Sequence, residues 1–179
     1  MTTALSEGGT DSLRRSDWLI KITRAGVIAA VYCVLTFALA PVSFGPFQFR
    51  AAEAMAVLPM IFPEATAGLF VGCILSNLLS SYGVLDVVIG SLATLCAALL
   101  TARAKKLWLA PVPPVIINAV AVGFAITFAQ AGMDISSFPI GVYLMNAGSL
   151  FISEAVVCFG LGIPLLIGVK KYMTRKNNT

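Results

Sequence analysis

Eight polar or charged side chains lie inside apolar stretches of the sequence or at their edges. They are Gln48, Arg50, Glu53, Asn77, Asp86, Asn118, Asn146 and Glu154. A charge at the centre of a bilayer costs about 3 kcal/mol on insertion scales, so each such group needs a partner, a cavity or a function. Carboxylates accept hydrogen bonds, whereas amide and guanidinium groups donate them. The set therefore has the chemistry to bind a polar solute.

Three of the charged groups also have a structural explanation. Arg50 and Glu53 are three residues apart and could pair on the surface of one helix. Asp86 stands near the start of a predicted helix, where a carboxylate complements the positive end of the helix dipole. The sequence alone leaves both interpretations open.

Glu154 is harder to explain structurally, because it lies about 14 residues into an apolar run, roughly 20 Å along a helix. Asn146, Ser149 and Ser153 fall along one face of that helix, and Glu154 flanks the face. This polar strip is expected either to bind a ligand or to form a structural hydrogen-bond network.

The usual side chains of metal and catalytic centres are missing from the sequence. It has no histidine, and its cysteines are scattered without a Cys-x-x-Cys pair. The four cysteines are therefore predicted to be small packing residues: Cys33, Cys73, Cys96 and Cys158. The sequence also lacks the Gly-x-x-x-x-Gly-Lys-Ser/Thr loop that holds ATP. We expect no cofactor, no metal and no enzymatic activity from this chain.

Composition places most of these residues in a membrane. Of the 179 residues, 59% are hydrophobic and 11% are charged, which is unusual for a soluble domain. Because a span needs about 20 apolar residues, the length predicts an all-α integral membrane bundle of six transmembrane helices. The net charge is +4, but the basic residues stand at predicted helix ends, so no nucleic-acid-binding face is expected.

The predicted helices follow from apolar runs and the prolines that interrupt them. They cover residues 22–40, 50–62, 63–79, 85–102, 114–130 and 140–169. The last run is longer than a span needs, so it should tilt, kink near residues 160–164 or extend past the membrane. Residues 1–16 are predicted to be a disordered tail, residues 17–171 the membrane domain, and residues 172–179 a basic tail.

Basic residues predict how the bundle is oriented. All but one of the 12 Lys and Arg residues fall in three clusters, before the first span, after the fourth and at the chain end. Six spans put these clusters on one side, which the positive-inside rule makes cytoplasmic. We therefore expect a multi-pass protein of the cell membrane with both termini inside. The segments 42–50, 80–86 and 130–139 should then face outward.

Small residues in the first span form overlapping small-xxx-small pairs. They are Ala25, Gly26, Ala29 and Ala30. Such pairs let another helix approach closely. The approaching helix could belong to this chain or to an external partner.

A series of motifs follows in a fixed order: RAGVIAAVY at 24–32, APVSFGPFQFR at 40–50, and segments 53–64, 68–79 and 81–95. In order and spacing, these motifs resemble the QueT family of queuosine-precursor transporters. The resemblance covers about residues 24–102, and beyond them the likeness is mainly one of hydropathy. Ala52 departs from the pattern, since the family more often has Ser before the Glu.

This resemblance implies an architecture, partners and a ligand. The chain would be the substrate-binding component of an energy-coupling-factor importer, acting with a separate transmembrane scaffold and two ATPase subunits. Ala25 and Ala29 would belong to the face that docks on the scaffold. The ligand would be a deazaguanine with a cyano or an aminomethyl group.

The chemistry of such a ligand can be compared with the residues. A guanine-like edge offers two N–H donors to a carboxylate and one oxygen to an amide or an Arg, and its flat ring stacks on aromatic side chains. The predicted substrate-binding residues are Phe47, Gln48, Arg50, Glu53, Asn77, Tyr82, Asp86, Asn118, Asn146 and Glu154.

Three alternatives remain at the level of the sequence. The chain could be a substrate-binding component for another vitamin. It could be a proton-coupled secondary transporter in which Glu154 or Asp86 carries the proton, although no inverted repeat is visible. A membrane-embedded enzyme is the third alternative, and it lacks a recognisable catalytic group.

Overall fold

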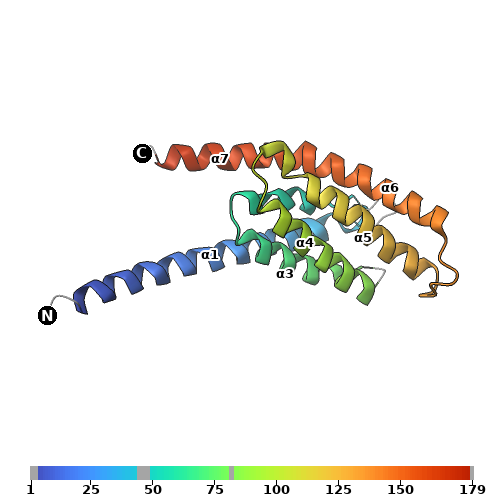
Figure 1. Cartoon of the computed structure of the whole chain (residues 1–179), viewed down its shortest axis with the longest axis horizontal. Helices are drawn as coiled ribbons and strands as arrows, with labels where there is room; N and C mark the ends of the chain where they lie inside the picture. The colour runs from blue at the N-terminus through green and yellow to red at the C-terminus, as the bar shows by residue number, and fades with distance from the viewer. Residues whose placement is uncertain (1–3, 44–48, 81–82, 178–179) are drawn as a thin grey trace.

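The computed structural model describes residues 4–43, 49–80 and 83–177 (Figure 1). These residues form helices joined by short connections, with no β-strand among them. The prediction of an all-helical bundle is confirmed.

The first helix, α1 (Ala4–Ala38), is much longer than the predicted span. It starts at Ala4, so most of the segment predicted to be a disordered tail continues the span as helix. In Figure 1 its first turns project away from the other helices. One further turn, α2 (Ala40–Ser43), follows it.

Small residues bring α1 into close contact with α3 (Ala65–Asn77). A Cβ atom added at Gly68 would lie 2.4 Å from the carbonyl oxygen of Ala25, and one at Gly72 would lie 3.1 Å from that of Ala29. These glycines thus permit a backbone approach that a larger residue would block. The helix that approaches Ala25 and Ala29 here belongs to this chain, and the docking role that the resemblance implied for them stays a prediction.

A buried 3-10 helix, η1 (Ala51–Met60), runs through the middle of the bundle. Residues 52–59 are all buried. At about 2 Å per residue, its ten residues cover roughly 20 Å. A Cβ atom at Gly162 would lie 3.1 Å from the carbonyl oxygen of Ala54, so the last helical run also packs directly on η1. This packing carries Glu53 into the protein interior.

The next elements complete the inner layer of helices. A π turn, η2 (Asp86–Gly90), leads into α4 (Ser91–Thr101), and the turn η3 (Leu107–Leu109) precedes α5 (Val112–Gln130). Prolines in the first turn of α5 fit there because that turn needs no N–H donors. The apolar contact among α4, α5 and α6 (Ile140–Val157) is made by Ala93, Ala119, Val122, Ile126 and Leu150.

The last apolar run is interrupted where the sequence predicted a kink. The π turn η4 (Cys158–Gly162) separates α6 from α7 (Ile163–Asn177). Pro164 has no N–H to bond the preceding turn, which explains the irregular turn before it. The run also continues past the apolar residues, so α7 includes most of the segment predicted to be a basic tail.

Within the described residues, three continuous helical stretches are long and apolar enough to cross a membrane. They are Arg15–Ala38, Leu107–Gln130 and Ile140–Lys176. The three apolar helices between them, Ala51–Met60, Ala65–Asn77 and Asp86–Thr101, are shorter than a full span. The six predicted runs are therefore present in order, but the middle three are shorter than predicted.

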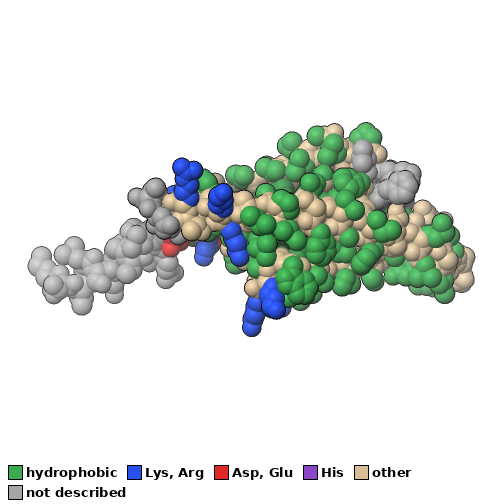
Figure 2. Space-filling model, turned by 90° about the horizontal axis from the view of Figure 1, so that it is seen from above, with side chains coloured by type: hydrophobic (Ala, Val, Ile, Leu, Met, Phe, Trp, Pro, Cys, Tyr) green, Lys and Arg blue, Asp and Glu red, His purple; other side chains and the backbone are tan. Residues whose placement is uncertain are grey.

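The outer surface of the bundle is largely hydrophobic (Figure 2). Large apolar side chains point outward, including Leu78, Met145 and Ile152, which are 65%, 75% and 66% exposed. Such a surface suits lipid rather than water. Lys and Arg side chains gather toward the end of the bundle from which α1 projects (Figure 2). Both chain termini lie at this end, opposite the connection between α5 and α6 (Figure 1).

Candidate functional site

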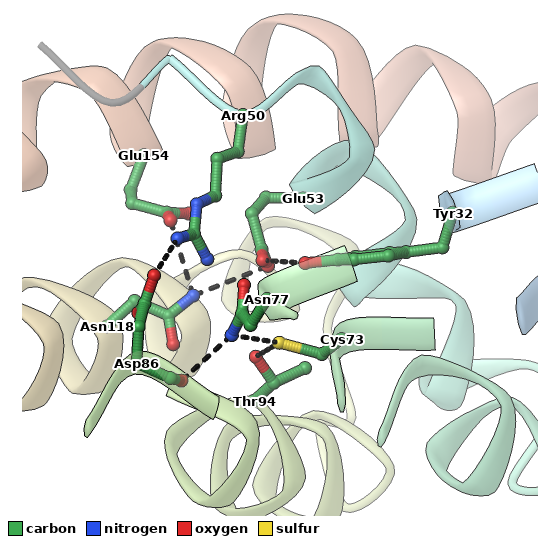
Figure 3. A network of polar contacts seen from close by, with 9 residues as sticks. All are labelled: Tyr32, Arg50, Glu53, Cys73, Asn77, Asp86, Thr94, Asn118 and Glu154. Atoms are coloured by element: carbon green, nitrogen blue, oxygen red, sulfur yellow. Dashed lines mark hydrogen bonds and ion pairs between the residues drawn. The ribbon is translucent and has the colours of Figure 1, made fainter. Parts of the chain in front are cut away.

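Polar side chains from seven elements meet in the interior of the bundle (Figure 3). Six of the ten predicted binding residues belong to this buried cluster: Arg50, Glu53, Asn77, Asp86, Asn118 and Glu154. Each of the six is at most 5% exposed. Buried groups of this kind are stable only when they are paired, so their contacts define the site.

An ion pair joins the start of η1 to η2. The Arg50 Nη2 atom lies 2.9 Å from the Asp86 Oδ2 atom, and both side chains are buried. Arg50 has an extended backbone just before η1, with φ −93° and ψ 93°, so it does not share a helical face with Glu53. Pairing between Arg50 and Glu53 on a helix surface, the simpler explanation, is therefore wrong. Asp86 has a specific partner in addition to its place at a helix start.

One amide connects two carboxylates. The Asn118 Nδ2 atom, on α5, donates to Glu53 Oε2 and to Glu154 Oε1, each at 3.3 Å. The other Glu53 oxygen accepts a hydrogen bond from the Tyr32 hydroxyl on α1. The Cys158 thiol lies 3.6 Å from Glu154 Oε2. Elements η1, α5 and α6 are thus linked through Asn118.

A second set of contacts, made by residues of α3 and α4, holds the backbone of Asp86 in place. The Asn77 Nδ2 atom donates to the Asp86 carbonyl oxygen at 2.9 Å and to the Cys73 sulfur at 3.3 Å. The Thr94 hydroxyl donates to the same sulfur at 3.3 Å. A Cβ atom at Gly90 would lie 2.8 Å from Asn77 Nδ2 and 2.9 Å from Asp86 Oδ1. Glycine at this position makes room for the contact between α3 and η2.

Several acceptor atoms of the cluster have no donor within the described part of the chain. They are Asn77 Oδ1, Asp86 Oδ1 and Asn118 Oδ1. The buried hydroxyl of Ser76 also lacks a partner among the described residues. Leaving a buried acceptor unpaired costs about 1–3 kcal/mol. A solute that brings N–H groups to these oxygens would recover that energy.

A hollow of about 400 Å³ is lined in part by the chain neighbours of two cluster residues, Arg50 and Glu154. It is lined by Phe49, which precedes Arg50, and by Ser149, Ile152, Ser153 and Val156 of α6. The size suits a small bicyclic molecule.

Comparison with known proteins assigns the family. The sequence model of a family described as "QueT transporter" matches residues 22–171. The chain belongs to this family. The match includes α5 and α6, so it extends well beyond the segment in which the sequence motifs were recognised. A transporter family and an apolar exterior together establish a membrane protein.

A curated relative carries a more specific name. The protein named "Queuosine precursor transporter QueT" from Lactococcus lactis subsp. cremoris (strain MG1363) is 36% identical over 76 residues. The aligned stretch is 41% of this chain and 44% of that protein, less than half the length of either. No solved structure matches the chain.

Of the other four predicted site residues, the structure describes Asn146 alone. Phe47, Gln48 and Tyr82 lie outside the described residues. Asn146 donates to Thr127 Oγ1 at 3.0 Å and to Gln130 Oε1 at 3.1 Å, which ties α6 to α5. It lies eight residues, or about 12 Å, from Glu154 along the helix. Asn146 thus takes part in a structural hydrogen-bond network, whereas Glu154 belongs to the cluster.

Sequence reasoning missed three members of the cluster: Tyr32, Cys73 and Thr94. Tyr32 could have been found, because it follows Ala25 by seven residues and Ala29 by three and so shares their inward face. Cys73 is buried as predicted for a packing residue, but its sulfur also accepts two hydrogen bonds. The sequence carries no signal for that role.

Proposed function

We propose that this chain is the substrate-capture subunit of an energy-coupling-factor importer for a queuosine precursor. The substrate would be a deazaguanine with a cyano or an aminomethyl group. Membership of the QueT transporter family and the name of the Lactococcus relative support this substrate class. The observation that carries the proposal is the buried cluster around Asn118, because its spare acceptors match the donors of a guanine-like edge.

The cluster supplies complementary groups on several sides. The two N–H donors of the pyrimidine edge would bond a carboxylate or the amide oxygens of Asn77 and Asn118, which have no donor among the described residues. The Arg50 guanidinium would donate to the exocyclic oxygen. Phe49 borders the adjacent hollow and would stack on the ring, as would Phe47 and Tyr82. Stacking on an aromatic side chain contributes roughly 1–3 kcal/mol per base.

The distribution of basic residues supports the proposed orientation. Lys and Arg gather at the end that holds both termini, which the positive-inside rule places in the cytoplasm of a cell-membrane protein (Figure 2). The solute would then enter from the opposite end of the bundle, which holds the connection between α5 and α6. Release into the cell would follow docking on the scaffold.

Energy for transport would come from other subunits. The sequence has no ATP-binding loop, so a transmembrane scaffold and two ATPases would supply the driving force. Import of the deazaguanine by cells that contain this chain should require co-expression of such a module. Import that persists after both ATPases are inactivated would contradict the proposal.

The binding step is tested by calorimetric titration of the detergent-solubilised protein. Cyano- and aminomethyl-deazaguanine are the ligands, with guanine and riboflavin as controls. We expect submicromolar binding of at least one deazaguanine and a loss of at least tenfold in affinity in Glu53→Gln. Tight binding of riboflavin without either deazaguanine would reassign the chain to another vitamin.

The buried acids also suit a proton-coupled secondary transporter. Glu53 and Glu154 share the amide of Asn118, so a proton could pass between two carboxylates inside the bundle. Proteoliposomes that contain the purified chain alone separate the two mechanisms. Uptake driven by a proton gradient favours the secondary transporter, and binding without uptake favours the capture subunit.

A further inference from the structure

An apolar groove opens on the outer surface of the bundle between α1 and the last helical run. Its volume is about 610 Å³. Buried residues of η1, including Ala54 and Leu58, form its floor. Exposed residues form its two rims, among them Val31 on α1 and Leu165 on α7. No member of the buried polar cluster lines this groove, so it is separate from the candidate solute site.

The dimensions of the groove suit a hydrocarbon chain. It follows α1 from Thr23 to Leu35, which is roughly 18 Å of helix. One leaflet of a bilayer is about as thick, since the whole hydrocarbon core measures roughly 30 Å. Divided by that length, the volume gives a cross-section of about 34 Å², whereas a helix about 10 Å across needs roughly twice as much. The groove is therefore too narrow to hold a helix.

The walls of the groove offer almost nothing to a polar solute. Every lining residue is apolar except Thr23 and Arg24, which stand together at one end. The Thr23 hydroxyl donates to the Leu19 carbonyl oxygen at 2.9 Å, so its hydrogen atom is already used. A polar molecule would lose its hydration along this wall without gaining partners, but an acyl chain loses nothing there.

Arg24 is held in place at the polar end of the groove. Its Nη1 atom lies 3.0 Å from Glu64 Oε1, and its guanidinium carbon lies 4.7 Å from the centre of the Phe62 ring. The side chain is nevertheless 47% exposed. A guanidinium has five N–H donors in a rigid fork, so most of them remain available to an oxyanion such as a phosphate.

Other basic residues flank the same end. Lys21 precedes Arg24 by one turn of α1 and shares its face. Lys170 and Lys171 directly follow the last residue of α7 that lines the groove. The end of α7 lies at the same end of the bundle as the start of α1 (Figure 1). The charge of Glu64 offsets only one of these four basic residues, which leaves this end positive.

We propose that the groove binds an anionic phospholipid, with one acyl chain between α1 and α7 and the headgroup phosphate on Arg24. Basic pockets between transmembrane helices recognise anionic headgroups in this way. The lipid would fill the gap between α1 and α7 and so hold the two helices at a fixed separation. This inference goes beyond the proposed function, because lipid binding requires no transported solute.

Native mass spectrometry of the full chain, purified in detergent, tests the proposal. Phosphatidylglycerol and phosphatidylcholine with the same acyl chains are added in equal amounts, so that a difference in retention reports the headgroup alone. We expect one retained lipid per chain and at least about fivefold more phosphatidylglycerol than phosphatidylcholine, as for one basic residue at the headgroup. Retention of no lipid, or equal retention of the two, would overturn the proposal.

Two variants that break the same ion pair separate a headgroup contact from a structural role. Arg24→Gln removes the proposed phosphate ligand, so the preference for phosphatidylglycerol should fall at least about threefold. Glu64→Gln also removes the ion pair but leaves all the Arg24 donors to the lipid, so the preference should be kept or increased. An equal fall in both variants would show that Arg24 acts only through Glu64 and would overturn its assignment as the phosphate ligand.

Filling the groove tests where the acyl chain lies. Val31→Trp places a large side chain in the groove and should lose most of the retained lipid, and Val27→Trp should do the same one turn closer to Arg24. Val71→Trp is the matched control, because Val71 on α3 is similarly exposed but does not line the groove. Equal retention in the three variants would place the lipid elsewhere. A dimer of the wild-type chain without lipid, lost in Val31→Trp, would assign the groove to a second copy and overturn the proposal.

Discussion

Replacing Gly68 by Ala should destabilise the bundle by forcing α1 and α3 apart. The new Cβ atom would lie 2.4 Å from the Ala25 carbonyl oxygen and 3.1 Å from the Ile28 Cβ atom. Relief of the shorter contact requires the helices to separate by roughly 0.5–1 Å, which loses a quarter to a half of each dispersion contact across the interface. Overpacking of this kind costs about 1–3 kcal/mol, and a clash with backbone belongs at the upper end.

Thermal unfolding of the detergent-solubilised protein measures this effect. A loss of about 2–3 kcal/mol corresponds to a fall in Tm of roughly 4–12 °C for a chain of this size. Gly26→Ala is the matched control, because a Cβ atom at Gly26 meets nothing within 4 Å. Alanine is the better helix former, so this control should keep or slightly raise the Tm. Equal Tm values for Gly68→Ala and Gly26→Ala would refute the close packing of α1 on α3.

Two further substitutions test the arrangement of the cluster. Gly90→Ala should push Asn77 away from Asp86, since its Cβ atom would lie 2.8 Å from Asn77 Nδ2. Deazaguanine binding should then weaken at least about tenfold. Gly168→Ala is the control: its Cβ atom meets nothing within 4 Å, so this variant should bind normally. Arg50→Met should lower the free energy of unfolding by about 3–5 kcal/mol, because it leaves Asp86 buried without its ion-pair partner. The double variant Arg50→Met/Asp86→Leu should regain most of that stability, as measured by thermal unfolding, but not ligand binding. A double variant that is as unstable as the single one would show that the ion pair is not the main loss.

The order of helices was predictable because hydropathy dominates this sequence. Prolines and basic residues between the apolar runs marked the boundaries, and the kink before Pro164 followed from its missing N–H. The lengths of the three middle helices were not predictable in the same way. The 3-10 geometry of Ala51–Met60 depends on close packing against Gly162 and the surrounding helices, which a single-sequence pattern does not encode.

Much of the cluster was predictable because a membrane protein has few reasons to bury a polar group. Arg50, Glu53 and Glu154 stood out against apolar neighbours and proved to be buried together. Their partners could not be derived. Arg50 and Asp86 are 36 residues apart, and their pairing depends on where η2 packs relative to η1.

Helical faces explain two further contacts that the sequence did not specify. The small residues of α1 predict a contact face, but spacing does not say which helix fills it, and α3 fills the side of Ala25 and Ala29. Asn146 shares a polar strip with Glu154 in the sequence, yet the two side chains are two turns apart. A hydrogen-bonding partner on α5 was closer for Asn146 than any member of the cluster.

The measurement that tests the central claim most directly is the titration of two matched Asn variants with the deazaguanine that binds best. Asn118→Ala removes the amide that links Glu53 to Glu154, while Asn146→Ala removes an amide of the same size on the neighbouring helix outside the cluster. If the cluster is the solute-binding site, Asn118→Ala should lose at least about tenfold in affinity and Asn146→Ala less than about threefold. Equal losses in both variants, or a loss confined to Asn146→Ala, would contradict that claim.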